Sequence, residues 1–303
     1  MPKTLIILNP HAGGGRAGRL WQEVEPLLWK NLGELIVAVT DQPHEVAQHL
    51  DKAQAIGVRR VVSIGGDGTN HALINALVEL NSRHPSDEPM IYGNLPIGTG
   101  QDWARGQGVP FNDLKAAAAW IAHAQPKPTD IGKLSHERGH EYFLNIASAG
   151  ISGDIAEQVN HTPTRRPWSF LSTTVRTLIT HHPQTMEITL DGADWYDGRA
   201  YIVAVANGTT FGHGMKIAPN AEQRDGLFDV VLVEGVSRLT ILAALQRVYS
   251  GTHLTHPAVR AGRAAEVRIR SPQGALGLEL DGEPVSASDL TFSIQPGLLQ
   301  ILS

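Results

Sequence analysis

The residues with the clearest chemical potential form a glycine-rich turn that carries one carboxylate, Gly65-Gly66-Asp67-Gly68-Thr69-Asn70. The apolar run Val61–Ile64 before it predicts a buried strand, and the leucines between 73 and 80 predict one face of a helix. A strand, a glycine turn and a helix place backbone N–H groups and a helix N-terminus in front of an anion. Glycine also lets the backbone approach a phosphate closely, because it has no Cβ.

Asp67 needs a separate explanation, because a carboxylate beside a phosphate is repulsive by itself. The repulsion disappears if Asp67 holds Mg²⁺ directly or through water, since Mg²⁺ is bound by few carboxylates together with substrate phosphates. A simpler alternative is an ordinary strand-to-helix turn in which Asp67 caps the helix. The motif alone does not separate these two interpretations.

A second pair of carboxylates, Asp281 and Glu283, flanks Gly282 near the C-terminus. Paired carboxylates suit general acid–base chemistry. The alternative is a tight turn between two strands, in which Asp-Gly has a purely conformational role.

The first part of the chain predicts the scaffold for the glycine turn. Apolar strand patterns alternate with helix patterns, which is typical of βαβ units and a parallel sheet. The expected strands are Leu5–Leu8, Leu35–Val39, Arg60–Ile64 and Ile91–Leu95; the expected helices are Arg19–Leu28, one starting at Pro43, Thr69–Leu80 and Leu114–Ala122. Ligands bind at the carboxyl ends of such strands. Those ends carry Asn9, Gly13, Thr40, Gly65–Thr69 and Gly98–Thr99, so we expect these loops to converge.

The pattern changes at the linker Gln125–Pro128, after which strands alternate in antiparallel style. The expected strands are Thr129–Leu134, Glu141–Ala147, Gln184–Leu190, Arg199–Asn207, Phe228–Glu234, Ala264–Arg270, Leu276–Leu280, Leu290–Ile294 and Leu298–Leu302, with helices near Gly150–Asn160, Trp168–Thr180 and Ser237–Ser250. The predicted fold class is therefore α/β plus β. An α/β nucleotide-binding domain spans residues 1–126 and a β-rich substrate domain spans 127–303, and the last strand is compatible with either domain.

Composition limits the possible functions. The 303 residues suffice for two domains, and 42% hydrophobic with 18% charged residues is ordinary for a globular protein. The absence of cysteine excludes disulfides and thiolate metal sites. No apolar run approaches the roughly 20 residues of a membrane span, and the first apolar stretch is too short for a signal peptide, so we expect a cytoplasmic protein. A net charge of −5 gives no general affinity for nucleic acid.

Five blocks in order resemble the diacylglycerol kinase catalytic-domain family, bacterial lipid kinases related to sphingosine and ceramide kinases. The resemblance covers nearly the whole chain. The blocks are Asn9-Pro10 with its glycines, Gly65–Asn70, Pro96–Arg105, Asn207–Pro219 continued by Asp225–Asp229, and Leu280–Glu283. One departure is Gln101, which stands where the family usually has asparagine.

The resemblance implies transfer of the ATP γ-phosphoryl group, with Mg²⁺, to a lipid hydroxyl such as that of diacylglycerol. It assigns nucleotide contacts to Asn9, Pro10, Gly13, Thr40, Gly65, Gly66, Asp67, Gly68, Thr69, Asn70 and Thr99. Taken alone, Thr40 and Thr99 are equally well explained as helix-cap or turn residues. The resemblance makes Glu283 the proton acceptor, with Asp281 supporting it or sharing the role, and the sequence does not decide between them.

A further metal position is implied in the second domain. There the Asp225 carboxylate and main-chain carbonyls near Glu222 and from Leu227 would hold a structural or regulatory Mg²⁺, which prefers oxygen ligands. The alternative is a solvent-facing Asp-Gly turn. Lys216 could pair with a phosphate or lie on the surface. The histidines lack metal-site spacing, and only His213 lies in one of the shared blocks.

The expected partner is a lipid with a free hydroxyl, reached by transient, peripheral contact with a membrane surface. The basic and apolar stretch Thr164–Ile179 has the composition of a membrane-interface segment, although a core helix with arginines at its edge explains it equally well. A homodimer is compatible with the sequence, which does not specify the oligomeric state.

Three functional hypotheses follow. The first is an ATP-dependent lipid kinase. The second is a kinase for a soluble acceptor, such as an NAD kinase, which also carries Gly-Gly-Asp-Gly-Thr. The third is a nucleotide- or lipid-binding regulator without catalysis, against which the presence of Asp67, Asp281 and Glu283 argues.

Overall fold

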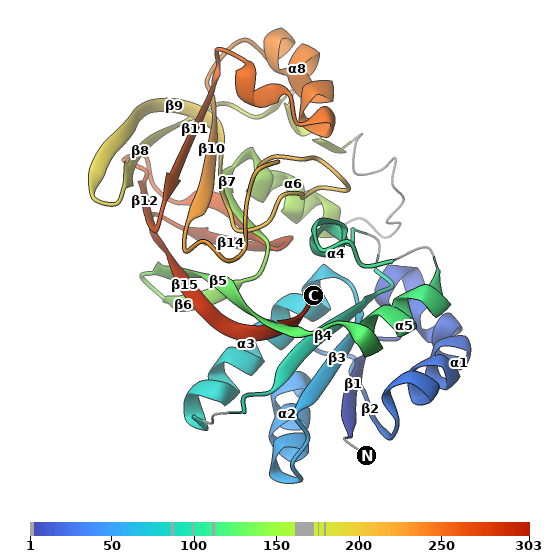
Figure 1. Cartoon of the computed structure of the whole chain (residues 1–303). Coiled ribbons are helices and arrows are strands. Elements are labelled where there is room, and N and C mark those ends of the chain that lie inside the picture. Colours follow the sequence, from blue (N-terminus) through green and yellow to red (C-terminus); the bar gives the residue numbers. More distant parts are fainter. Residues whose placement is uncertain are drawn as a thin grey trace. The chain divides into compact units, whose positions relative to one another are not determined.

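A computed structural model describes residues 3–85, 88–98, 100–110, 113–160, 173–174, 176–178 and 180–303 (Figure 1). The chain divides into two compact units, Met1–Thr129 with Gly297–Ser303, and Asp130–Pro296. We call them the N-terminal and the C-terminal unit. The expected fold class, a parallel α/β part followed by a mostly antiparallel β part, is confirmed.

The N-terminal unit is built on a parallel sheet with the strand order β4-β3-β1-β2. Its strands are β1 (Thr4–Leu8), β2 (Leu35–Val39), β3 (Arg60–Gly65) and β4 (Ile91–Pro96). The last residues of the chain return to this unit, because Ile301 of β15 (Asp289–Leu302) pairs in parallel with Tyr92 of β4. β1 and most of β3 are buried, which explains their nearly continuous apolar sequences.

Two helix pairs cover the sheet. Helices α1 and α5 pack together on one face, and α2 and α3 pack together on the other (Figure 1). The helices are α1 (Ala12–Leu32), α2 (Glu45–Ala55), α3 (Asp67–Arg83), α4 (Asp102–Gly106) and α5 (Leu114–His123). Val24 and Leu28 of α1 and Ile121 of α5 form one core with Val62 and Ile64 of β3. This amphipathic packing supplies most of the stability of such helices.

Two predicted helix starts are wrong. Helix α1 begins at Ala12 rather than Arg19, because the three glycines after Ala12 form a turn that opens the helix. Helix α2 begins at Glu45, so Pro43 precedes it instead of lying in its first turn. The reason is that the Glu45 carboxylate accepts the Asp41 and Gln42 backbone N–H groups, at 2.9 and 3.1 Å, and so caps the helix from inside.

The C-terminal unit is a set of antiparallel strands with the order β14-β13-β7-β9-β8-β12-β15, and β10 joins β9 to β11. Its strands are β5 (Pro126–His136), which enters it from the N-terminal unit, β6 (Gly139–Phe143), β7 (Ile146–Gly150), β8 (Gln184–Leu190), β9 (Ala193–Ala206), β10 (Phe228–Glu234), β11 (Val259–Ala264), β12 (Glu266–Arg270), β13 (Leu276–Leu280), β14 (Glu283–Ala287) and β15. Phe143, Phe228 and Phe292 meet in its core, with ring centroids 5.7 and 6.2 Å apart.

Some predicted strands differ from the structure. The stretch Glu141–Ala147 is two strands, β6 and β7, separated at Leu144–Asn145. Ala264–Arg270 is β12 preceded by the end of β11, whereas Leu290–Ile294 and Leu298–Leu302 belong to the single strand β15.

Helices accompany these strands. They are α6 (Ile151–Asn160), α8 (Arg238–Ser250) and the 3₁₀ turn η1 (His253–Thr255). Ser237 caps α8 by accepting the Thr240 N–H at 3.2 Å. Most of the expected helix Trp168–Thr180 lies outside the described residues. Among the described helices, none has the length and apolar character needed to cross a membrane.

We expect His253 to make stability depend on pH. Burial lowers the pKa of its imidazole, although Nε2 donates to the Ile217 carbonyl at 2.9 Å and opposes this effect. The unfolded chain takes up a proton below a pH of about 6.5 while the folded state resists it, so the free energy of unfolding falls as the pH drops below that value. Melting temperatures between about pH 8 and 5 should therefore fall less steeply for His253→Gln than for wild type. Exposed His44→Gln is the control; parallel curves for His253→Gln and wild type would contradict the assignment.

Candidate active site

Three loops at the carboxyl ends of β1, β3 and β4 meet through their backbones. A Cβ on Gly98 would overlap the Cα of Gly66, and a Cβ on Gly13 would lie 2.7 Å from the Ile97 carbonyl oxygen. Only glycine allows contacts this close. The predicted convergence is therefore present for the loops that contain Gly13, Gly65–Gly66 and Gly98.

The first of these loops is a left-handed turn. Gly13, Gly14 and Gly15 have φ values of 62°, 67° and 80°, which other residues rarely adopt. The Pro10 carbonyl accepts the Gly18 N–H at 3.1 Å and ties the turn to α1. The loop therefore presents bare backbone beside the Ile97–Gly98 segment.

Helix α3 begins directly after the second loop. Gly66 is its extended N-cap residue, and Asp67 lies half-buried in the first turn. The Asp67 and Asp102 carboxylates border one point, because a Cβ on Gly100 would overlap Asp67 Oδ2 and lie 3.5 Å from Asp102 Oδ2. Two hard oxygen donors at a helix N-terminus that faces anion-sized backbone loops fit Mg²⁺ together with phosphate.

A buried polar network fixes the start of α3. Asn70 Oδ1 accepts the Ser63 hydroxyl at 2.6 Å and Asn94 Nδ2 at 2.7 Å. One residue earlier, Thr69 Oγ1 accepts Asn9 Nδ2 at 3.2 Å. Sequence reasoning missed Ser63 and Asn94, although each is a polar residue inside an otherwise apolar strand. The side chains of Thr69 and Asn70, which were predicted to bind nucleotide, are thus bonded within the fold, where they orient the glycine turn.

The remaining predicted nucleotide residues lie at the same edge or outside the described part. Thr40 is buried at the end of β2, and its N–H donates to the Leu8 carbonyl at 2.9 Å. Thr99 is outside the described residues. Gln101 is buried with a left-handed backbone, and its amide donates to the Pro96 and Gly98 carbonyls at 3.1 and 2.8 Å. In this chain the longer amide therefore braces the third loop.

In the C-terminal unit, Asp281 is an anchor. Asp281 and Gly282 have φ values of 51° and 91° and form the tight turn between β13 and β14. The Asp281 carboxylate accepts the N–H groups of Leu144, Asn145 and Ile146 at 2.7, 2.9 and 3.1 Å. Successive N–H groups around one carboxylate form an anion nest. This nest explains why the predicted strand Glu141–Ala147 is interrupted.

A second carboxylate braces the same turn. Glu279 is buried, and it accepts the Ser148 hydroxyl at 2.7 Å and the Gly282 N–H at 2.6 Å. Sequence reasoning missed Glu279, whose signal was a charged residue inside the apolar strand Leu276–Leu280. Asp281 and Glu279 together hold the turn from both sides.

Glu283 differs from both of these acids. It is the first residue of β14 and is half-buried. Across the described residues, no hydrogen bond or ion pair engages its side chain. Of the predicted pair, Glu283 is therefore the carboxylate whose oxygens are available to a substrate.

The residues of the second predicted metal position make other contacts. Asp225 Oδ1 accepts the Leu227 N–H at 3.0 Å, and Oδ2 accepts the Arg263 guanidinium. Glu222 is exposed. Within the part of the chain that the structure describes, no three His, Asp or Glu side chains are grouped as metal ligands. As these residues stand, they do not fit Mg²⁺, because a cationic side chain already neutralises Asp225.

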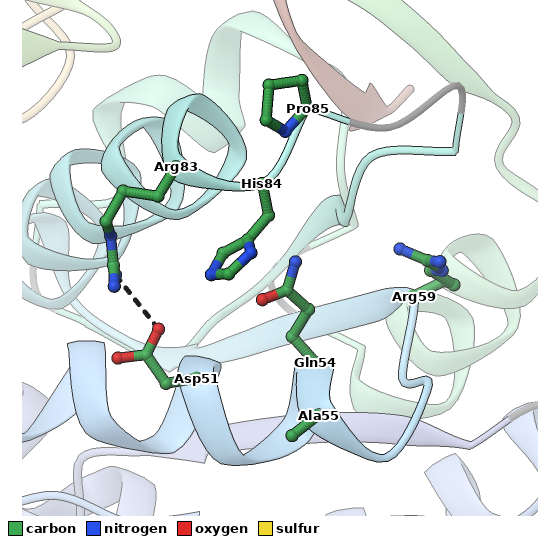
Figure 2. Close-up of a pocket in the computed structure, with 7 residues that line it drawn as sticks. All are labelled: Asp51, Gln54, Ala55, Arg59, Arg83, His84 and Pro85. Atoms are coloured by element: carbon green, nitrogen blue, oxygen red, sulfur yellow. Dashed lines mark hydrogen bonds and ion pairs between the residues drawn. The ribbon is translucent and has the colours of Figure 1, made fainter.

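A hollow of about 500 Å³ lies at the opposite end of β3 from the glycine loops (Figure 2). It is lined by Asp51, Gln54, Ala55, Arg59, Arg83, His84 and Pro85. The C-terminal ends of α2 and α3 contribute most of this lining, and helix C-termini attract cations. This effect, with the 3.0 Å ion pair between Arg83 and Asp51, accounts for the basic residues there. The hollow contains none of the predicted site residues.

Comparisons with known proteins agree with this architecture. Residues 3–134 match the diacylglycerol kinase catalytic domain, and residues 145–303 match the YegS C-terminal NAD kinase beta sandwich-like domain. Together the fold, its glycine loops and these matches define a two-domain kinase. The chain belongs to the family of bacterial diacylglycerol kinases and YegS-like lipid kinases.

Individual relatives cover almost all of the chain. A diacylglycerol kinase of Mycobacterium tuberculosis is 27% identical over 99% of this chain and 94% of the relative. A Pseudomonas syringae protein named "Probable lipid kinase YegS-like" is 29% identical over 88% of this chain and 83% of its own. The crystal structure of a Bacillus anthracis diacylglycerol kinase, 21% identical, has a similar fold, with a TM-score of 0.72 over 99% of this chain and 96% of that one.

We expect the contact between the glycine loops to be asymmetric toward substitution. Gly98→Ala forces a Cβ into the Cα of Gly66, whereas a Cβ on Gly66 would meet Gly98 Cα at an ordinary 3.6 Å. Gly98→Ala should lower the free energy of unfolding by about 1–3 kcal/mol, and the matched Gly66→Ala should lower it much less. Denaturant titrations of both variants measure this. Equal losses would mean that the loops do not pack as described.

Replacing Asp281 should destabilise the C-terminal unit. Both oxygens of this carboxylate accept backbone N–H groups, so Asp281→Asn turns its own N–H₂ toward a donor. The expected loss is about 1.5–3 kcal/mol of unfolding free energy, as for other hydrogen bonds to charged groups. Asp191→Asn is a matched control, because that exposed Asp-Gly turn uses only Oδ1 for the Ala265 and Glu266 N–H groups. Chemical denaturation would contradict the clamp if both variants lost the same small amount.

Proposed function

We propose that this protein transfers the γ-phosphoryl group of ATP, with Mg²⁺, to the hydroxyl of a lipid such as diacylglycerol. The observation that carries the proposal is the distribution of roles among three neighbouring acids. Asp281 and Glu279 are used to hold a rigid turn, and Glu283 on that turn has its carboxylate available. The names of the relatives support a lipid as the acceptor.

The nucleotide is assigned to the N-terminal unit. Backbone N–H groups around Gly13 and Gly65–Gly68, and the N-terminus of α3, would bind the phosphates, because these groups carry partial positive charge. Asn9, Pro10, Thr40 and Thr99 are assigned to the same nucleotide by the family resemblance. Thr69 and Asn70 would act by holding the turn in shape.

Asp67 would hold Mg²⁺, with Asp102 bordering the same point. When bound, the metal ion neutralises charge on the transferring phosphoryl group. The protein's own contribution is to fix the Asp67 carboxylate in the first turn of α3. No metal is assigned to Asp225, Glu222 and Leu227.

Glu283 would accept the proton of the attacking lipid hydroxyl. A general base must reach the proton that it takes, so it must be held firmly without being used in other hydrogen bonds. The Asp281 nest and the Glu279 brace provide the rigidity. Asp281 is thus a positioning residue in this mechanism, which separates the two roles that the sequence left open.

One observation favours a second candidate. The C-terminal domain match is described as NAD kinase-like, so a soluble acceptor such as NAD is the alternative. The two candidates differ only in the acceptor alcohol.

Phosphoryl transfer from labelled ATP separates the candidates. The purified protein would be incubated with Mg²⁺ and either vesicles of mixed hydroxyl-bearing lipids or NAD, and the labelled product identified by mass spectrometry. Label in a lipid supports the proposal, and label in NAD alone supports the alternative. Label in neither, with intact ATP binding, would favour the non-catalytic hypothesis.

Glu283→Gln should abolish transfer without unfolding the protein. The loss of a general base should lower kcat by about 10²-fold or more. The melting temperature and ATP affinity should stay near wild type, because the Glu283 side chain makes no hydrogen bond or ion pair within the described residues. Steady-state kinetics and isothermal titration calorimetry measure these quantities, with exposed Glu266→Gln as the control. Wild-type kcat in Glu283→Gln would exclude Glu283 as the base.

A further inference from the structure

An arginine-centred cluster in the C-terminal unit carries a further inference. We call Arg263, Asp225 and Asp229 the arginine cluster. The Arg263 guanidinium donates to Asp225 Oδ2, and its Nε lies 3.5 Å from Asp229 Oδ2. One side-chain cation therefore bridges two carboxylates at the position where the sequence predicted a metal ion.

The sheet sets this geometry. In the pairing of β10 with β11, Asp229 lies directly opposite Arg263. Directly opposite residues on antiparallel strands have neighbouring side chains, and opposite charges there are stabilising. The guanidinium thus starts from a position that the backbone register fixes. This makes the contact more than a chance pairing of long surface side chains.

The turn that carries Asp225 is braced independently. Gly226 has a φ of 73°, and its N–H donates to Asp130 Oδ2 at 2.8 Å. The Leu227 N–H donates to Asp225 Oδ1 at 3.0 Å. With Arg263 on Oδ2, each oxygen of the Asp225 carboxylate accepts a donor. A divalent cation would have to compete for those lone pairs with a guanidinium that is always charged.

Local charge leads to the same conclusion. Two carboxylates close together repel each other and need a cation nearby. Arg263 supplies it from within the chain, and a fork-shaped guanidinium can bind two carboxylates at once. A metal ion would be required here only if this side chain were absent.

We propose that the Arg263 guanidinium replaces the divalent cation in this chain, so that the turn Asp225–Leu227 is held without metal. Two consequences follow. Removing metal should leave the turn of the wild-type protein unchanged. Removing the guanidinium should leave Asp225 and Asp229 as an uncompensated oxygen-donor pair that Mg²⁺ can then stabilise.

Hydrogen–deuterium exchange of peptides covering residues 222–230 tests both consequences in the full chain without nucleotide. Wild type should exchange at the same rate in EDTA and in excess Mg²⁺. Arg263→Ala should exchange at least about tenfold faster in EDTA, as expected when a hydrogen bond to a charged group is lost. Added Mg²⁺ should return this rate toward the wild-type value.

Arg260→Ala is the matched control, because Arg260 lies on the same strand and pairs with Glu234 away from the cluster. It should show neither faster exchange at residues 222–230 nor a response to Mg²⁺. If Arg263→Ala fails to fold, Arg263→Lys replaces it, and the wild-type arm stands by itself. Wild-type exchange that slows on adding Mg²⁺ would overturn the proposal, as would an Arg263 variant that matches Arg260→Ala or exchanges faster without any response to Mg²⁺.

Discussion

The close approach of bare backbone between Gly66 and Gly98 is the constraint on which the N-terminal unit depends. Neighbouring parallel strands bring their carboxyl ends to one edge, but side chains would normally keep the following loops apart. Glycine removes that obstacle here, so β3 can lead directly into α3 beside the loop after β4. The network around Asn70 and Ser63 then locks the helix start against the sheet. The result is a concentration of backbone N–H groups suited to a polyphosphate.

The C-terminal unit assigns its acids to distinct tasks. Asp281 fills a nest of N–H groups, Glu279 braces the same turn, and Asp225 shares a guanidinium with Asp229. Each of these carboxylates is compensated by donors inside its own unit, which is how buried or half-buried charges are normally tolerated. Glu283 is the exception on the Asp281 turn. A carboxylate held rigidly but left available is the arrangement that proton transfer from an alcohol requires.

Local sequence was sufficient wherever structure is locally determined. The strands Phe228–Glu234 and Leu276–Leu280 were predicted at their observed bounds, because an apolar pattern ends there at turn residues. The break in Glu141–Ala147 was not predictable, since its cause is a carboxylate 136 residues further along the chain. The Arg263 contact depends in the same way on strand register, which no local pattern encodes. Site residues in shared motifs were found, whereas Glu279 and Ser63 were missed because they act through the fold.

Selective labelling of the glycine amides with ¹⁵N tests the central claim, that bare backbone at the strand ends binds the triphosphate, most directly. Adding Mg²⁺-ATP should shift the amide signals of Gly13, Gly66 and Gly98, assigned by single substitution of each glycine. The signal of Gly57, which lies between the hollow-lining residues Ala55 and Arg59, should stay in place. Shifts confined to Gly57, with the loop glycines unmoved at saturating nucleotide, would contradict the account.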